Sequence, residues 1–362
     1  MKERRKRNMS RTGLLFLFCL LMLCGCTHIT GFMENTEVSG REVESLAAEK
    51  EDDTVLLGGM PVGIYMETDG VLVLDTEKMT GMDGKEYTPA QGVVSSGDYI
   101  TEVNHQKIEG KKQLMDLVEH LDGEKVLLTV RRENTILEKK LTPVQISKGN
   151  YRLGIWVRDN VQGLGTITFL TKNNRFAALG HGIHDIDTST LLTIKRGTLY
   201  RTSIQKVQKG SKGNPGTMEG IIVYNRFHRL GVIEKNTDAG IYGELNSDRS
   251  WIGEEVPIQV AKKEEIKTGE ARIRCYIDGE VKEYTICITQ IDKESDQVNK
   301  GMVIQVTDTE LLEKAGGIIQ GMSGSPIIQN GKLIGAVTHV FVQDSTKGYG
   351  IFIENMLKEE ES

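Results

Sequence analysis

Long apolar runs, cysteines and basic tracts are scarce in this sequence. No apolar stretch reaches the roughly 20 residues that a membrane-spanning helix comfortably needs. No basic tract follows the N-terminal segment, so the chain offers no electrostatic footprint for nucleic acid. Prolines number only 6, whereas glycines number 40 in 362 residues. This composition favours a globular protein with many tight turns and short strands over a helical bundle.

The N-terminus has the pattern of an export signal. Six basic residues and one acid fall within residues 1–26, and an apolar run of about eleven residues, Leu14 to Cys24, follows the basic flank. The net charge of residues 1–26 is +5. Because the whole chain has a net charge of −6, the remaining residues carry −11. Leu23-Cys24-Gly25-Cys26 also resembles a bacterial lipobox with Cys26 as the lipidated residue, and uncleaved anchoring is a third option. We expect residues 1–26 to be a signal peptide or membrane anchor, and residues 27–53 to be a polar linker.

Only two of the five cysteines, Cys275 and Cys287, lie outside this export segment. They sit in a predicted hairpin of residues 272–277 and 280–289 around Asp278-Gly279. A two-residue turn pairs Cys275 with Lys282 and puts the two cysteines on opposite faces, which argues against a disulfide between them. The pair also lacks metal-site spacing, so both are interpreted as small buried apolar residues.

Residues 54–146 are predicted to form one domain of short strands with a single helix. Strands are expected at 71–74, 99–104 and 125–131, and the apolar spacing over 111–121 predicts a helix. Two passages, Pro89 to Ile100 and Val103 to Ile108, resemble the corresponding stretches of bacterial PDZ modules, although His105 replaces a glycine. The resemblance implies a peptide-binding loop at Val62, Gly63 and Ile64, whose N–H groups would take a chain-terminal carboxylate. The alternative is a small αβ domain that binds nothing.

Residues 147–358 read as an all-β domain, of sandwich or barrel type. Alternation over 163–170, a turn, and a return strand at 176–179 suggest a hairpin, and residues 333–342 are apolar on both faces, which predicts a buried central strand. A short helix is expected at 309–315. The predicted fold is therefore mainly β, with a PDZ-like α+β domain before an all-β domain.

A glycine-rich turn carries the strongest chemical signal. Gly321-Met322-Ser323-Gly324-Ser325-Pro326, followed by an apolar pair, Asn330-Gly331 and a return strand, resembles the nucleophile segment of trypsin-like serine peptidases, whose barrels would be paired. Ser325 replaces the second glycine of that pattern. By this match Ser323 is the nucleophile, and the backbone N–H groups of Gly321 and Ser323 would form the oxyanion hole. The bland alternative is a turn that joins two strands.

A serine hydroxyl needs a base, usually a histidine within hydrogen-bond reach. His181 follows a predicted strand and lies between Gly180 and Gly182, which suits a cleft, whereas His339 lies inside the predicted buried strand and reads as a core histidine. We expect the fold to bring the His181 ring within hydrogen-bond reach of the Ser323 hydroxyl. The series His181, His184, Asp185 and Asp187 also admits a weaker zinc reading; we expect no metal and no cofactor.

The orienting acid is left open by residue pattern alone. The candidates between base and nucleophile are Asp185, Asp187, Asp238, Asp248, Asp292 and Asp308.

The chain from about residue 54 onward resembles the stage IV sporulation protein B family, the sporulation serine peptidases of endospore-forming bacteria. The resemblance rests on Ala178-Leu179-Gly180-His181-Gly182 and on Gly317 through Phe341, together with the export signal and the PDZ-like module. It implies a triad of His181, Asp308 and Ser323. Helix N-capping is the alternative role for Asp308.

The resemblance also implies a role in signalling. The peptidase would be exported across the membrane of the developing spore, remain membrane-associated or be released between the two membranes, and cleave its own N-terminal region. It would then cut the exposed part of a membrane-bound regulator, which releases an intramembrane protease and activates a late sigma factor. The alternatives are a PDZ-containing stress-type serine protease and a non-catalytic PDZ adaptor.

Overall fold

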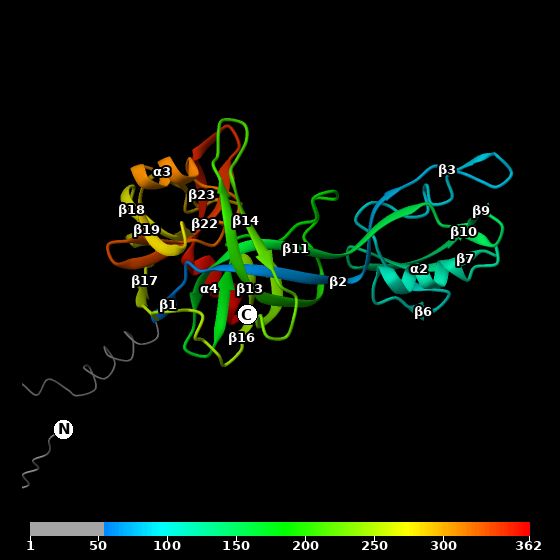
Figure 1. Ribbon diagram of the computed structural model, residues 1–362, viewed down its shortest axis with the longest axis horizontal. Coiled ribbons are helices and arrows are strands. Elements are labelled where there is room, and N and C mark those ends of the chain that lie inside the picture. Colours follow the sequence, from blue (N-terminus) through cyan, green and yellow to red (C-terminus); the bar gives the residue numbers. More distant parts are fainter. Residues whose placement is uncertain (1–53) are drawn as a thin grey trace, which may run out of the picture. The chain divides into compact units, whose positions relative to one another are not determined.

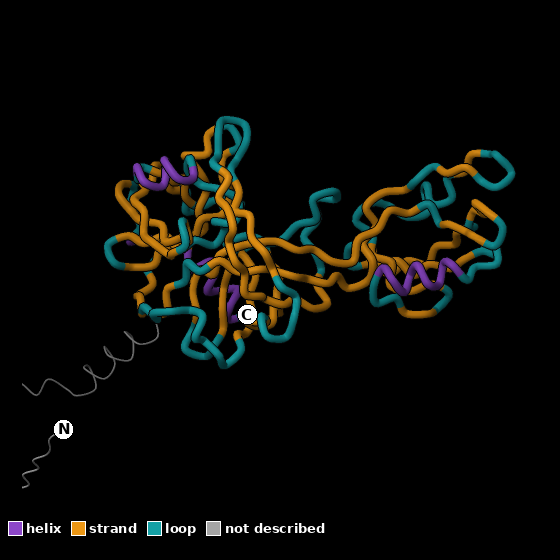
Figure 2. The backbone as a smooth tube through the Cα atoms, viewed as in Figure 1, coloured by secondary structure: helices purple, strands orange, loops and turns teal. Residues whose placement is uncertain are grey.

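The computed structural model describes residues 54–362, so the predicted signal segment and polar linker lie outside the described residues. Strands dominate the described chain, as Figure 2 shows, and the predicted mainly β fold is confirmed. Within residues 54–362, no helix is both long and apolar enough to cross a membrane.

Six antiparallel strands close a first barrel. Each strand pairs with the next around a ring, and the last pairs with the first. If the six strands are numbered by their order along the chain, they follow one another around the ring as first, second, third, sixth, fifth and fourth. The strands are β2 (Pro61–Thr76), β11 (Ile155–Leu170), β12 (Arg175–Ala178), β16 (Gly240–Leu245), β15 (Arg229–Thr237) and β13 (Ile194–Gln208). Their inward side chains form one apolar core that includes Ile64, Ile167 and Phe176.

A second barrel has the same strand order. Its ring is also closed by antiparallel pairs throughout. The strands are β18 (Gly269–Ile277), β19 (Glu280–Ile291), β20 (Met302–Val306), β23 (Asp344–Phe352), β22 (Lys332–Phe341) and β21 (Pro326–Gln329). A separate core, which includes Ile273, Tyr284 and Ile304, fills this barrel. The predicted double-barrel architecture follows from these two rings.

Short elements join the two barrels. Strand β1 (Thr54–Leu57) pairs with β11 of the first barrel and with β17 (Pro257–Val260), which in turn pairs in parallel with β22 of the second. Helix α4 (Ile353–Glu361) buries Met356 in a core shared with Phe169 of β11 and Leu333 of β22. The hairpin of β13 and β14 (Thr217–Ile222) reaches the second barrel through a parallel bridge between Thr217 and Gln320.

A third group of elements, which we call the lobe, is inserted between the first and second strands of the first barrel. It has its own core around Val71, Ile100 and Leu128. Its elements (Figure 1) are the second half of β2 and the first half of β11, with β3 (Met79–Thr80), β4 (Glu86–Tyr87), β5 (Tyr99–Val103), β6 (Gln106–Lys107), α2 (Lys111–Glu119), β7 (Val126–Arg132), β8 (Thr135–Leu141), β9 (Val144–Ser147) and β10 (Asn150–Arg152).

Strand pairing divides the chain differently from the predicted boundary at residues 146 and 147. Strand β1 and the first part of β2 pair within the barrel, because Val62 to Glu67 lie between β11 and β13. The β2–β11 ladder shifts register between Arg158 and Asn160 and then continues into the lobe. The predicted strands and helix of the lobe are present at their expected places. That the lobe is a PDZ module stays a prediction.

The predicted cysteine hairpin is confirmed. Strands β18 and β19 pair Cys275 with Lys282 and Cys287 with Glu270 across the turn at Asp278-Gly279. Both cysteines are free, Cys275 is fully buried, and burial raises the pKa of its thiol. Cys275 therefore serves as a small core residue, as the sequence predicts.

Candidate active site

Ser323 lies in the connection between the third and fourth strands of the second barrel, immediately before β21. The turn depends on glycine, because Gly321 and Gly324 have φ values of +102° and +93°. A Cβ at Gly324 would lie 2.0 Å from the carbonyl oxygen of Thr166 and 2.5 Å from the backbone nitrogen of Leu179. The nucleophile turn is therefore pressed against β11 and the end of β12, where the two barrels meet.

The backbone N–H groups of this turn fall into two sets. Those of Met322, Gly324 and Ser325 donate to the carbonyls of Ile319, Val337 and Met322. Those of Gly321 and Ser323 donate to no acceptor within the described residues. An oxyanion is stabilised by unpaired N–H donors near the nucleophile, and here one belongs to the serine itself and the other to the residue two positions before it.

His181 occupies the equivalent connection of the first barrel, between its third and fourth strands. It follows β12 after Leu179 and Gly180, both of which have positive φ. A Cβ at Gly180 would lie 3.1 Å from a methyl carbon of Thr338 in β22. The base candidate and the nucleophile candidate thus approach the same strand, β22, from opposite barrels.

The Ser323 hydroxyl is engaged by β22. Its Oγ donates to the carbonyl oxygen of Thr338 at 2.7 Å, and no hydrogen bond joins it to His181 among the described residues. The expected hydrogen bond between Ser323 and His181 is therefore absent from this arrangement. Catalytic hydrogen bonds are often formed only when substrate is bound, so the hydroxyl would have to rotate from Thr338 toward the imidazole.

His339, which follows Thr338 in β22, corrects the sequence interpretation of a buried core histidine. His339 is exposed to solvent, and its ring faces that of His181 with centroids 4.6 Å apart and an interplanar angle of 34°. The strand is buried up to Thr338 and opens at a register shift between Val337 and Val340. Alternation of polar and apolar residues could not reveal this, because the shift changes which face a side chain occupies.

The surroundings of His181 favour the neutral imidazole. Burial lowers the pKa of His181, and the nearby His184 lowers it further, whereas the hydrogen bond to the Gly182 carbonyl raises it. The contact between Nδ1 and the Gly182 oxygen is 2.9 Å long. A histidine that is neutral near pH 7 can accept a proton from a serine hydroxyl.

Asp308 serves as a helix cap in this structure. It is the N-cap of α3 (Thr309–Ala315), where its carboxylate accepts from the N–H of Leu311 at 3.1 Å and from that of Thr285 at 3.2 Å. Its described contacts do not include His181. The bond from Leu311 is the N-cap bond that the sequence alternative for Asp308 requires, and the bond from Thr285 ties the carboxylate to β19.

The remaining acids near His181 have other partners. Arg158 of β11 forms ion pairs with the buried carboxylate of Asp185 and, at 2.8 Å, with that of Asp187. Asp238, in the turn between β15 and β16, lies 3.7 Å from Nε2 of His184. The four residues of the zinc reading therefore do not converge, and residues 54–362 contain no group of three or more ligand side chains able to hold a metal.

The predicted PDZ loop requires a correction. Val62, Gly63 and Ile64 lie in β2, where β11 pairs with them on one side and β13 on the other. Val62 and Ile64 are also buried in the first barrel core. With both strand edges occupied, these residues cannot present free N–H groups to a carboxylate.

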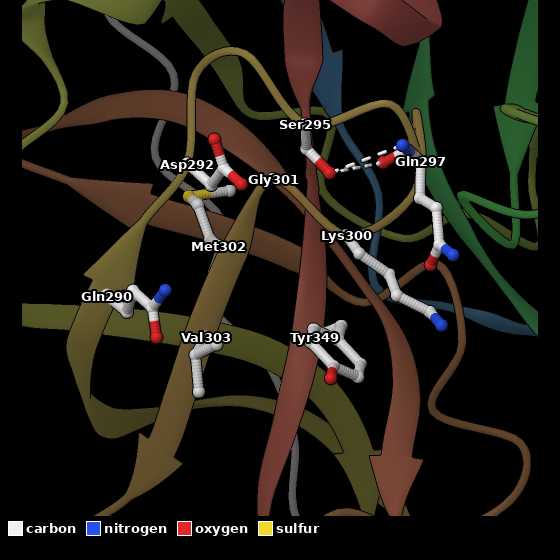
Figure 3. Close-up of a pocket in the computed structure, with 9 residues that line it drawn as sticks. All are labelled: Gln290, Asp292, Ser295, Gln297, Lys300, Gly301, Met302, Val303 and Tyr349. Atoms are coloured by element: carbon white, nitrogen blue, oxygen red, sulfur yellow. Dashed lines mark hydrogen bonds between the residues drawn. The ribbon is translucent and has the colours of Figure 1, made fainter.

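Two cavities adjoin the segment 297–300, which precedes β20. One, of about 450 Å³, is lined by His339, His184, Asp238 and the segment 296–300. The other, of about 240 Å³, is shown in Figure 3, where Lys300 lies beside Tyr349. Lys300 borders both cavities, and its ammonium group lies 5.1 Å from the centre of the Tyr349 ring. The larger cavity is bordered by His339, whose ring stacks on that of His181.

Comparison with known proteins gives similarities of different weight. A putative zinc metalloprotease of Helicobacter pylori is 31% identical in an alignment 180 residues long that covers 43% of this chain; the chain spans about half the length of this curated relative. Solved structures of the Rv3671c protease of M. tuberculosis match with TM-scores of 0.32 for the active form and 0.31 for the inactive form. Their sequence identities are 15% and 14%, and the matches cover 56% of this chain and 73% and 85% of those chains. At these TM-scores the similarity supports no conclusion about this chain.

The family comparison is decisive for the larger part of the chain. The model of the SpoIVB peptidase S55 family matches residues 149–357, which include every strand of the second barrel and both the His181 and Ser323 turns. The lobe lies almost entirely before this match. The chain belongs to the SpoIVB peptidase S55 family.

Proposed function

We propose that this protein is a serine endopeptidase in which Ser323 attacks the peptide carbonyl and His181 accepts its proton. The observation that supports this most directly is the convergence of the two turns at β22. Gly324 packs against Thr166 and Leu179, and the His181 backbone follows two residues later. The equivalent positions of the two turns in two barrels of equal strand order add to this support.

The reaction would pass through an acyl-enzyme. His181 takes the Ser323 proton as the Oγ–carbon bond forms, and the N–H groups of Gly321 and Ser323 donate to the developing oxyanion. His181 then gives the proton to the leaving amine, and a water molecule releases the acyl group by the same steps in reverse. Asp308 is the acid that the family resemblance implies, but its hydrogen bonds support a structural role.

The biological setting is the finer part of the proposal, and it rests on the resemblance to the sporulation peptidases. The protein would be exported across the membrane of the developing spore and stay membrane-associated or be released. It would cleave its own N-terminal region and then a membrane-bound regulator of an intramembrane protease. The lobe would guide or restrain the peptidase through peptide binding.

Self-cleavage of the purified full-length protein tests this function. Wild type, Ser323→Ala and His181→Gln are incubated with and without a chelator, and fragments are identified by mass spectrometry. We expect fragments from wild type only, unchanged by the chelator. Fragments from pure Ser323→Ala would assign the cleavage to another protease, and loss of cleavage with the chelator would favour a metal-dependent reaction.

A further inference from the structure

The described contacts of His181 include a carbonyl and an aromatic ring but no carboxylate. Its Nδ1 lies 2.9 Å from the Gly182 oxygen, and its ring faces that of His339. No ion pair to an Asp or Glu is formed by His181 among residues 54–362, and the carboxylate of Asp308 is used by two backbone N–H groups. The groups that contact this imidazole, and could orient it, are therefore the Gly182 carbonyl and the His339 ring.

The carbonyl contact defines the tautomer. A carbonyl oxygen can only accept, so Nδ1 must carry the hydrogen, and Nε2 is left with its lone pair. This is the tautomer that can receive the serine proton, and in many serine peptidases a carboxylate secures it. Here the Gly182 oxygen does so, and it also accepts from Nδ1 of His184 at 3.2 Å.

A hydrogen bond at one atom still leaves the imidazole free to tilt, and His339 limits that tilt. Two consecutive residues of β22 thereby contact both members of the dyad, because the Thr338 carbonyl holds the Ser323 hydroxyl and the His339 ring packs on His181. Thr338 is itself fixed by a 2.8 Å hydrogen bond from its Oγ1 to the Asn299 carbonyl. The His339 ring, which packs on His181, is thus carried by an anchored segment of β22.

Charge around the ring pair is compatible with this role. Although His339 is exposed on one side, partial burial of its ring lowers the pKa of His339, and the nearby His181, Lys300 and His184 lower it further, which keeps the ring neutral near pH 7. Asp238 and Asp296 also line the larger cavity that His339 borders. When His181 becomes an imidazolium, a neutral aromatic ring at 4.6 Å adds no repulsion and can attract the cation.

We propose that His339 is the positioning residue of the catalytic base: its ring and the Gly182 carbonyl hold His181, and Asp308 does not take part. This inference rests on the proposed function, since it names how that site is oriented. His339 also borders the 450 Å³ cavity, so its ring could instead only contact bound substrate. The test must therefore separate activation of Ser323 from binding of a peptide.

A fluorophosphonate probe makes this separation, because it forms a bond to Ser323 Oγ, loses fluoride and needs little of the peptide-binding surface. The second-order labelling rate of the full-length protein is measured from pH 5.5 to 9 for wild type, His339→Ala, His339→Phe, Asp308→Asn and Ser323→Ala. Thermal melting confirms that each variant is folded. His339→Phe keeps a flat ring, and Asp308→Asn keeps an acceptor for the helix cap.

We expect His339→Ala to label at least about 10-fold more slowly, and Asp308→Asn to label within about 2-fold of wild type. Removal of the ring exposes His181 to water, which raises its pKa, so the rise in labelling rate should move to higher pH. His339→Phe should retain most of the rate.

Three results would overturn the proposal. A folded His339→Ala variant that labels like wild type would show that the ring only contacts substrate or does nothing. A 10-fold loss in folded Asp308→Asn would restore that acid to the catalytic set. Equal losses in His339→Phe and His339→Ala, without a pH shift, would argue against stacking. Failure of wild type to label at Ser323 would count against the proposed function itself.

Discussion

The two barrels share one strand order but differ in how their first two strands are connected. In the second barrel a two-residue turn, Asp278-Gly279, joins β18 to β19. In the first, the whole lobe stands between the paired ends of β2 and β11, from Thr68 to Asp159. In both barrels the connection between the third and fourth strands carries a proposed catalytic residue, His181 in the first and Ser323 in the second. The same topology therefore places both proposed catalytic residues in one kind of connection and lets another connection accept a large insertion.

The largest effect is expected where the barrels touch. Gly324→Ala should lower the free energy of unfolding by about 4 kcal/mol or more, because the new Cβ meets the Thr166 carbonyl at 2.0 Å and the residue keeps a positive φ. Chemical denaturation measures the change. Gly163→Ala is the matched control, since nothing lies within 4 Å of its added Cβ. Equal stability of the two variants would mean that the barrels do not meet as described.

The next effect concerns the junction of the first barrel with the lobe. Arg158→Ala should cost about 3 kcal/mol, because the fully buried carboxylate of Asp185 loses its cation. Arg196→Ala removes an exposed pair with Glu67 in the same barrel and should cost less than about 1 kcal/mol. Urea unfolding of both variants gives the comparison. Similar small losses would show that the junction is not held by this ion pair.

The third prediction concerns the pH dependence of stability at the two stacked histidines, His181 and His339. The folded-state pKa values of His181 and His339 are lowered, so the unfolded chain binds more protons below its ordinary histidine pKa of about 6.5. Stability should therefore fall as the pH drops from 7.5 to 5. His339→Phe should reduce this fall by less than about 1 kcal/mol, since His339 is partly hydrated. Parallel pH curves for the two proteins would contradict this assignment.

The smallest effect lies behind the nucleophile. The Ser325 hydroxyl is fully buried and has no hydrogen-bond partner among the described residues. Ser325→Ala should raise the free energy of unfolding by up to about 1 kcal/mol without changing the labelling rate. In contrast, Thr168→Val removes a 2.8 Å hydrogen bond to the Gly324 carbonyl and should lower it by about 1 kcal/mol. Destabilisation by Ser325→Ala would reveal a partner for that hydroxyl.

Local patterns predicted the local structure well. The helix at 309–315 and the cysteine hairpin agree residue for residue with α3 and with the β18–β19 register, because capping and turn chemistry are encoded within a few residues. The motif around Ser323 and the glycines around His181 also identified the two turns that meet. Both are contiguous signals that need no tertiary information.

Long-range pairing was beyond the sequence. The sequence pattern predicts a binding loop at residues 62–64, yet β11 and β13 pair with them from positions 99 or more residues later in the chain. His339 was interpreted as a core residue because one register shift in β22 changes the direction of its side chain. A single sequence carries no direct record of such partners, so the boundary between lobe and barrel was also missed.

The strands that run from the first barrel into the lobe have a thermodynamic consequence. Because β2 and β11 contribute to both cores, neither part can lose these strands without weakening the other, and heating should produce one cooperative transition for residues 54–362. Any peptide that binds only the folded lobe would then raise the melting temperature of the whole unit. At a ligand concentration 100 times its Kd, the gain would be about 2.7 kcal/mol.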